Sequence, residues 1–127
     1  MTERKIRVIV ANRPRLLREL VLTTISEQPD IEIVGVANTE EEILGSVDQT
    51  HPDFLIIALE DSGNRPVICD FVLERHPEVK ILAIAPKRNV SVFYWASIDI
   101  CCECVESSER GILETLRKRQ PAMEAQQ

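Results

Sequence analysis

Long apolar segments are missing from this chain of 127 residues. A helix that spans a bilayer needs about 20 consecutive apolar residues, and no run here approaches that length, so we expect no membrane contact. The first five residues lead directly into a strand-like run, without the apolar core of a signal peptide. The length suits one domain with a sizeable core, and we predict a cytoplasmic protein.

Positive charge and glycine are also scarce. Lysine and arginine number 15 against 21 acidic residues, which gives a net charge of -6. Nucleic-acid binding relies on clustered Lys and Arg, so we predict that this domain does not bind nucleic acid directly. With only four glycines, the chain has no Gly-rich phosphate loop that would support a nucleotide site. Nor does any nucleophile–base pair or metal cluster emerge, so we predict a protein that is not an enzyme and holds no cofactor or metal.

Apolar β-branched runs alternate with helical patterns along the chain. The predicted strands are residues 6–11, 31–37, 54–59, 80–85 and 99–104. The predicted helices are residues 15–27, a segment that begins near Thr39, and residues 66–76, 90–97 and 107 or 108 to 119. Thr39 and Glu42 have the spacing of a capping box. Three of the strands are apolar without alternation, which is typical of strands covered on both faces.

Two of the helices have clear apolar stripes, which we expect to face the core. These are Leu16, Leu17, Leu20, Val21 and Ile25 in the first helix and Ile112, Leu113 and Leu116 in the last. Strands that alternate with helices favour a doubly wound sheet, because right-handed crossovers place helices on both faces. We therefore predict an α/β fold, a three-layer αβα sandwich around five parallel strands. Residues 1–120 form this domain, and residues 121–127 form a disordered tail.

A Pro-Asp step, Pro52-Asp53, leads into the buried third strand. In order and spacing the chain resembles the receiver domains of response regulators, most closely those with a helix-turn-helix output domain. The matching segments are residues 6–11, 16–20, 29–35, 51–59 and 74–80. The resemblance covers residues 5–119 and implies a flavodoxin-like strand order of 2-1-3-4-5, with a site at the carboxyl ends of the strands.

Receiver domains use a metal-binding acidic pair after the first strand, an aspartate nucleophile on the third, a hydroxyl after the fourth and a lysine after the fifth. In this chain the matching positions are Asn12 and Arg13, Ala58, Ala85, and Cys104. The metal neutralises charge on the phosphoryl group, whereas Arg13 repels a divalent cation. The resemblance thus implies a degenerate site, and we predict a pseudo-receiver that does not accept phosphate.

Charged side chains ring the expected mouth of this site. They are Arg13, Arg15, Lys87 and Arg88, with Glu60 and Asp61 just past the third strand. Helix N-termini at this edge also favour anions, which indicates an anion or nucleotide site. The simpler interpretation is a solvated rim in which Arg13 pairs with one of the two acids.

Four cysteines in a chain of this kind suggest reduced thiols rather than a disulfide frame. Alternation along a strand places Cys102 and Cys104 on one face and Cys101 on the other, and a closed zinc site usually takes four ligands. The simplest interpretation makes these residues and Cys69 small buried apolar side chains. Cys104 is the exception, because we expect it at the mouth of the degenerate site.

Three of the five aromatic residues are consecutive: Phe93, Tyr94 and Trp95. In a helix, successive residues point about 100° apart, so one core-facing stripe cannot bury all three. We predict that at least one of them contacts a partner. The surface would be that of the fourth helix, fifth strand and fifth helix, which receiver domains use to dimerise and to contact outputs. Packing against the sheet is the alternative.

Three functions stay open. The preferred one is an atypical receiver domain in bacterial two-component or phosphorelay signal transduction or transcription regulation, which acts by contact with a protein partner or as a homodimer, without phosphotransfer. The second is a sensor of a small ligand or of thiol redox state that uses the emptied pocket. The third is the receiver half of a longer DNA-binding response regulator.

Overall fold

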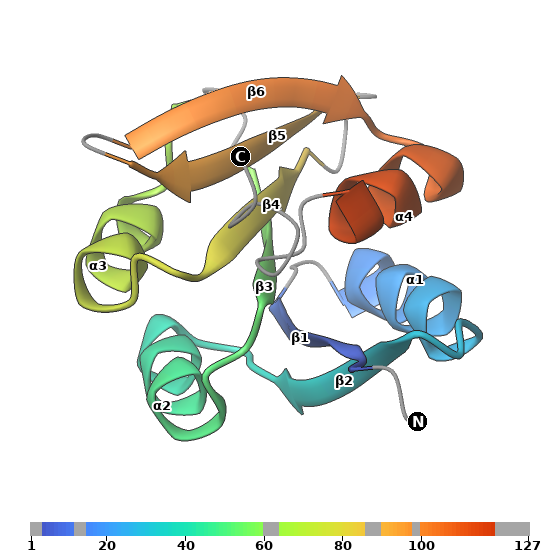
Figure 1. Ribbon diagram of the computed structural model, residues 1–127, viewed down its shortest axis with the longest axis horizontal. Helices are drawn as coiled ribbons and strands as arrows, with labels where there is room; N and C mark the ends of the chain where they lie inside the picture. Colours follow the sequence, from blue (N-terminus) through green and yellow to red (C-terminus); the bar gives the residue numbers. More distant parts are fainter. Residues whose placement is uncertain (1–3, 12–14, 60–63, 86–89, 98–99, 119–127) are drawn as a thin grey trace.

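The computed structural model describes residues 4–11, 15–59, 64–85, 90–97 and 100–118. Within these ranges six strands form one mixed sheet and four helices cover its two faces (Figure 1). In chain order the elements are β1 (Ile6–Ala11), α1 (Arg15–Ser26), β2 (Ile31–Val36), α2 (Glu40–Thr50), β3 (Phe54–Ala58), α3 (Val67–Arg75), β4 (Lys80–Ile84), β5 (Val90–Ala96), β6 (Ile100–Glu106) and α4 (Glu109–Lys118). The predicted α/β class is confirmed. Among the described helices, none has the length and apolar character needed to cross a membrane.

The first four strands are arranged as predicted. β1 pairs in parallel with β2 on one side and with β3 on the other, and β3 pairs in parallel with β4. The resulting order, β2-β1-β3-β4, agrees with the order that the receiver resemblance implies for these strands. β4 is buried throughout and β3 at every residue but its last, which is what an apolar run without alternation predicts.

Each face of the sheet has its own apolar core. α2 and α3 cover one face, where Val47 and Val72 pack against Leu55 of β3. α1 and α4 cover the other face, where Ile25 and Leu116 pack against Ile56 (Figure 1). The stripe predicted for the last helix is confirmed, because its three apolar residues are all buried.

The segment predicted to be the fourth helix is strand β5, so that prediction is wrong. β5 lies antiparallel between β4 and β6. Its residues Val90, Val92, Phe93, Tyr94 and Trp95 are β-branched or aromatic, types that fit a pleated surface well. Alternation along the strand sends Phe93 into the core under α1 and α4 and sends Tyr94 into the core under α2 and α3. A strand therefore buries both rings, one on each face of the sheet, whereas a helix with a single core-facing stripe does not.

Because β5 is a strand between β4 and β6, the sheet differs from the predicted one. The order is β2-β1-β3-β4-β5-β6, with parallel pairs up to β4 and antiparallel pairs beyond it. The predicted sheet of five parallel strands is thus corrected to a mixed sheet of six. β6 still runs parallel to β4, but β5 separates the two strands, and β6 becomes an edge of the sheet.

Two local features, one at each end of the parallel strands, help to set the fold. The Thr39 hydroxyl accepts a hydrogen bond from the Glu42 amide at 3.1 Å, so the predicted cap of α2 is confirmed. The Glu42 carboxylate reaches the amide of Asn38 at 2.7 Å rather than that of Thr39. Buried Asp53 accepts hydrogen bonds from the Arg4 guanidinium at 2.6 Å and the Arg7 amide at 3.0 Å. The Pro-Asp step therefore anchors β3 beside the start of β1.

Candidate functional site

The carboxyl ends of β3 and β4 lie where the degenerate site was predicted. Ala58 ends β3 beside Ile84 and is half-buried. Ala85 follows β4 and is 6% exposed, with its amide bonded to the Val90 carbonyl at 3.0 Å across the β4–β5 connection. Neither methyl side chain can attack a phosphoryl group or donate a hydrogen bond to one. These two positions offer no phosphotransfer chemistry.

Several of the predicted site residues fall outside the described part of the chain. They are Asn12, Arg13, Glu60, Asp61, Lys87 and Arg88. The side chain of Arg15 is likewise outside it. The metal-pair positions and the charged rim therefore stay predictions.

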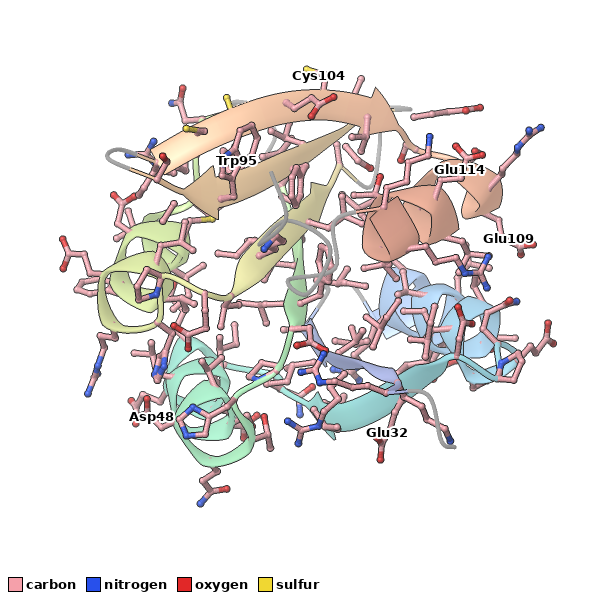
Figure 2. All side chains as sticks on the ribbon, in the orientation of Figure 1. Glu32, Asp48, Trp95, Cys104, Glu109 and Glu114 are labelled. Atoms are coloured by element: carbon pink, nitrogen blue, oxygen red, sulfur yellow. The ribbon has the colours of Figure 1, made fainter. Side chains whose placement is uncertain are left out.

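Cys104 is not at the mouth of the site, which corrects our expectation. It lies opposite Val92 of β5, and Val92 in turn lies opposite Ala83 of β4. A whole strand thus separates Cys104 from the end of β4. Figure 2 shows Cys104 on the outer strand, and it is exposed. The prediction failed because it assigned residues 90–97 to a helix, which would leave β6 beside β4.

The cysteines differ in their surroundings. Cys69 lies on the buried face of α3, and burial raises the pKa of its thiol to about 12, so that it stays protonated and slow to react. Cys102 and Cys104 are exposed, and Cys101 is half-buried. The prediction of buried apolar cysteines is therefore confirmed for Cys69 and wrong for Cys102. None of the four cysteines forms a disulfide.

The three consecutive aromatic residues are mostly core. Phe93 is 1% exposed and Tyr94 is 4% exposed, while Trp95 is half-buried. Burial also raises the pKa of the Tyr94 hydroxyl to about 12. Phe93 and Tyr94 are therefore inaccessible to a partner, and the predicted contact surface keeps only Trp95 (Figure 2). The helical spacing behind that prediction does not apply to a strand.

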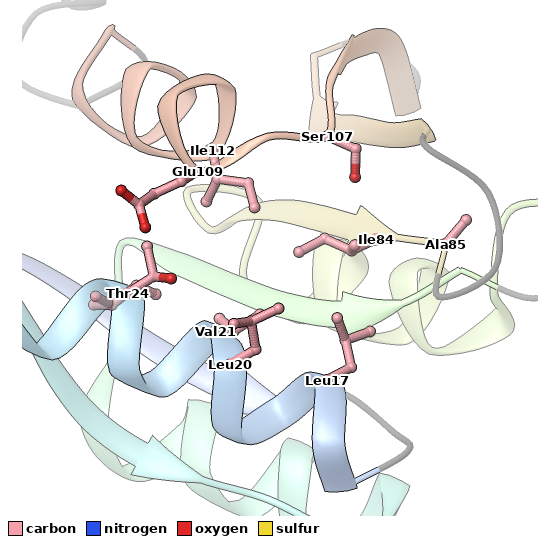
Figure 3. A pocket seen from close by; sticks show the side chains of 10 residues that line it. Leu17, Leu20, Val21, Thr24, Ile84, Ala85, Ser107, Glu109 and Ile112 are labelled. Atoms are coloured by element: carbon pink, nitrogen blue, oxygen red, sulfur yellow. The ribbon is translucent and has the colours of Figure 1, made fainter.

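A cavity of about 260 Å³ lies between α1 and α4, near the end of β4 (Figure 3). Its walls are mainly apolar, with Leu17 and Leu20 from α1 and Ile112 from α4, and Ser107 and Glu109 add polar atoms. Leu20 is 64% exposed, although the stripe of the first helix placed it in the core. The sequence did not reveal this cavity, because it depends on how far apart the two helices lie on the widened sheet.

No protein-family model matches the chain, and no curated protein matches its sequence. The resemblance to receiver domains therefore rests on this chain's own segments and on the arrangement of β1 to β4.

Proposed function

We propose that this chain is a receiver-like signalling domain that acts by contact with protein and without phosphotransfer. The observation that carries the proposal is the pair Ala58 and Ala85 at the ends of β3 and β4. The arrangement of the four strands supports a receiver-like scaffold, and the two alanines leave that scaffold without a nucleophile or a phosphate-binding hydroxyl. Signalling by such a domain depends on what its surface binds.

The surface that best fits protein contact is the edge strand β6. In the described part of the chain this seven-residue strand pairs only with β5. Edge strands are templates for pairing with another strand, and proteins usually protect them with proline, with charged side chains, most often lysine, or with a bulge. β6 contains neither proline nor lysine, and its central residues Cys102, Glu103 and Cys104 are all exposed. This edge takes the place of the surface that we expected around a fourth helix.

The partner in this proposal is a second copy of the chain, joined edge to edge by antiparallel β6 strands. The sequence of β6 allows such a pairing. A two-fold axis at Glu103 would set two glutamates opposite each other, which is destabilising. An axis at Cys102 instead sets Glu103 opposite Cys101 of the second copy, and an axis at Cys104 sets it opposite Val105. Either of these registers avoids the repulsion between like charges.

Sedimentation equilibrium tests this contact. The wild-type chain should have the mass of a dimer at micromolar concentration. Cys102→Asp should yield monomers, because it adds a charge at the centre of the edge without opening a core cavity. Thr23→Asp, which adds the same charge on the exposed side of α1, should leave the dimer intact. A wild-type monomer, or a Cys102→Asp protein that still dimerises, would overturn the edge pairing.

The cavity between α1 and α4 favours a second candidate function, that of a small-ligand sensor. Its volume of about 260 Å³ is slightly below the usual range of about 300–1,000 Å³ for ligand pockets. An environment-sensitive apolar dye should bind there, and Leu20→Glu should abolish the signal by placing a charge in the wall. Dye binding unchanged by Leu20→Glu would exclude this site.

A further inference from the structure

The chain has two histidines, and the fold brings them together. His51 follows α2 and His76 follows α3, and both residues precede strands. The two rings lie edge to face, with centroids 5.6 Å apart and an interplanar angle of 70°. They occupy the amino end of the sheet, opposite Ala58 and Ala85. In Figure 2 the nearby Asp48 lies on α2, far from Cys104 on β6.

The ring of His76 is held by two carboxylates. Its Nε2 lies 2.6 Å from Asp48 Oδ1, and its Nδ1 lies 3.6 Å from Glu78 Oε2. The Asp48 carboxylate accepts this hydrogen bond, and the Nε2 of His76 donates it. A proton held on Nε2 leaves the lone pair of Nδ1 directed toward Glu78. Carboxylates orient metal-binding imidazoles in the same way.

The spacing of the donor atoms suits a small cation. One ligand atom from each of His51, His76 and Glu78 lies within 4.8 Å of the other two. Ligands at about 2.0–2.2 Å from a tetrahedral zinc ion are about 3.4 Å apart. The 3.6 Å between His76 Nδ1 and Glu78 Oε2 is already close to that value, and small side-chain rotations bring in His51.

Hydrogen bonds hold the backbone at both histidines. His51 has φ 48° and ψ 63° and is the one non-glycine residue with positive φ among those described. Its amide bonds to the Val47 carbonyl at 3.0 Å, and Arg7 donates to the His51 carbonyl at 3.1 Å. Glycine or asparagine usually occupies this left-handed position after a helix, and histidine is also enriched there. At the other histidine, the Val79 amide bonds back to the His76 carbonyl at 3.0 Å, and this turn sets Glu78 beside the ring.

We infer that His51, His76 and Glu78 form a zinc-binding site in which Asp48 orients His76. Two imidazoles and a carboxylate are a donor set that zinc prefers, and three protein ligands leave one position for water. The bound ion would join the end of α2 to the connection between α3 and β4. The sequence did not predict this metal site, because the two histidines are 25 positions apart.

Titration calorimetry with zinc tests the site. Because exposed thiols also bind zinc, the parent protein for this experiment carries Cys101→Ser, Cys102→Ser and Cys104→Ser. We expect one zinc per chain in this parent. His51→Asn, which retains a residue suited to positive φ, and Glu78→Gln should each weaken or abolish binding. Asp48→Asn should weaken it about 10- to 100-fold. Glu74→Gln, an exposed neighbour on α3, should have no effect.

A second measurement uses the wild-type chain, in case the triple-serine protein does not fold. Its two histidine rings give two sets of imidazole proton signals, and both sets should shift as zinc is added. Cobalt in place of zinc should show visible bands without a thiolate charge-transfer band. Three results would show that the cluster is an ion-pair network and not a metal site. They are the absence of zinc binding, thiolate ligation of cobalt, and an affinity for zinc that is the same in His51→Asn and in its parent.

Discussion

Phe93 and Trp95 stack on the same face of β5, with ring centroids 5.2 Å apart and planes inclined by 22°. Phe93 also contacts Phe54 of β3, at a centroid distance of 6.1 Å. The three rings form a continuous row from Phe54, the first residue of β3, to Phe93 and Trp95 on β5. This row ties the antiparallel half of the sheet to the parallel half.

Removal of Phe93 should therefore strongly destabilise the fold. We expect Phe93→Ala to lower the free energy of unfolding by about 3–5 kcal/mol, the usual range for a buried phenylalanine. Trp95→Ala should cost less, because this side chain is half-buried. Phe71→Ala is the matched control: Phe71 is 51% exposed, so its loss should have little effect. Urea denaturation measures all three, and a small effect of Phe93→Ala would contradict the central place of β5.

Two glycines should respond to alanine in opposite ways. A Cβ atom at Gly111 would lie 2.2 Å from the Glu106 carbonyl oxygen, whereas one at Gly45 would meet nothing within 4 Å. Gly111→Ala forces the start of α4 away from the end of β6 and should destabilise the fold by about 1–3 kcal/mol or more. Gly45→Ala should stabilise α2 by about 0.5–1 kcal/mol. If urea denaturation gave the same change in the free energy of unfolding for both substitutions, Gly111 would not be closely packed against the end of β6.

Asp30 and Arg117 should make stability depend on pH. Arg117 donates to both carboxylate oxygens of Asp30, at 2.8 Å and 3.0 Å. These bonds hold the pKa of Asp30 below its usual value. A lowered carboxyl pKa stabilises the fold above the unfolded value of about 4, and the stabilisation is lost as the pH falls through the folded value.

The measurement compares wild type with Asp30→Asn by urea denaturation at several pH values. Near neutral pH the free energy of unfolding of the wild type should exceed that of Asp30→Asn by about 1 kcal/mol or less, because the side chains of Asp30 and Arg117 are both about two-fifths exposed. This difference should vanish in strong acid. Glu27→Gln, a nearby exposed carboxyl, should show no such pH dependence. An advantage for wild type that persists in acid would exclude the ion pair as its cause.

Phosphoryl donors should leave the protein unchanged. Incubation with acetyl phosphate and magnesium should add no mass to the wild-type chain, since Ala58 cannot form an acyl phosphate. Ala58→Asp alone should also stay unmodified, because Asn12 and Arg13 supply no metal pair. The triple variant with Asn12→Asp and Arg13→Asp should at least bind magnesium. A stoichiometric, acid-labile adduct on the wild-type chain, detected by intact mass, would contradict the proposed function.

Local sequence patterns were enough to predict most of the elements. The apolar runs in β1, β3 and β4 indicated buried parallel strands, and β1 begins and ends where predicted. The cap at Thr39 and the stripe of α4 were also read correctly, because each depends on residues within one or two helical turns. Capping and periodicity are local properties, so they can be read from neighbouring residues alone.

Tertiary structure decided the rest. A run as short as β5 fits either a helix or a strand locally, and pairing with both β4 and β6 selected the strand. That one choice removed the predicted fourth helix, moved Cys104 away from the degenerate site and made β6 an edge. The cluster of His51, His76 and Glu78 likewise exists only because α2 and α3 end at the same side of the sheet. Contacts between distant segments are set by packing and strand pairing, which no local pattern contains.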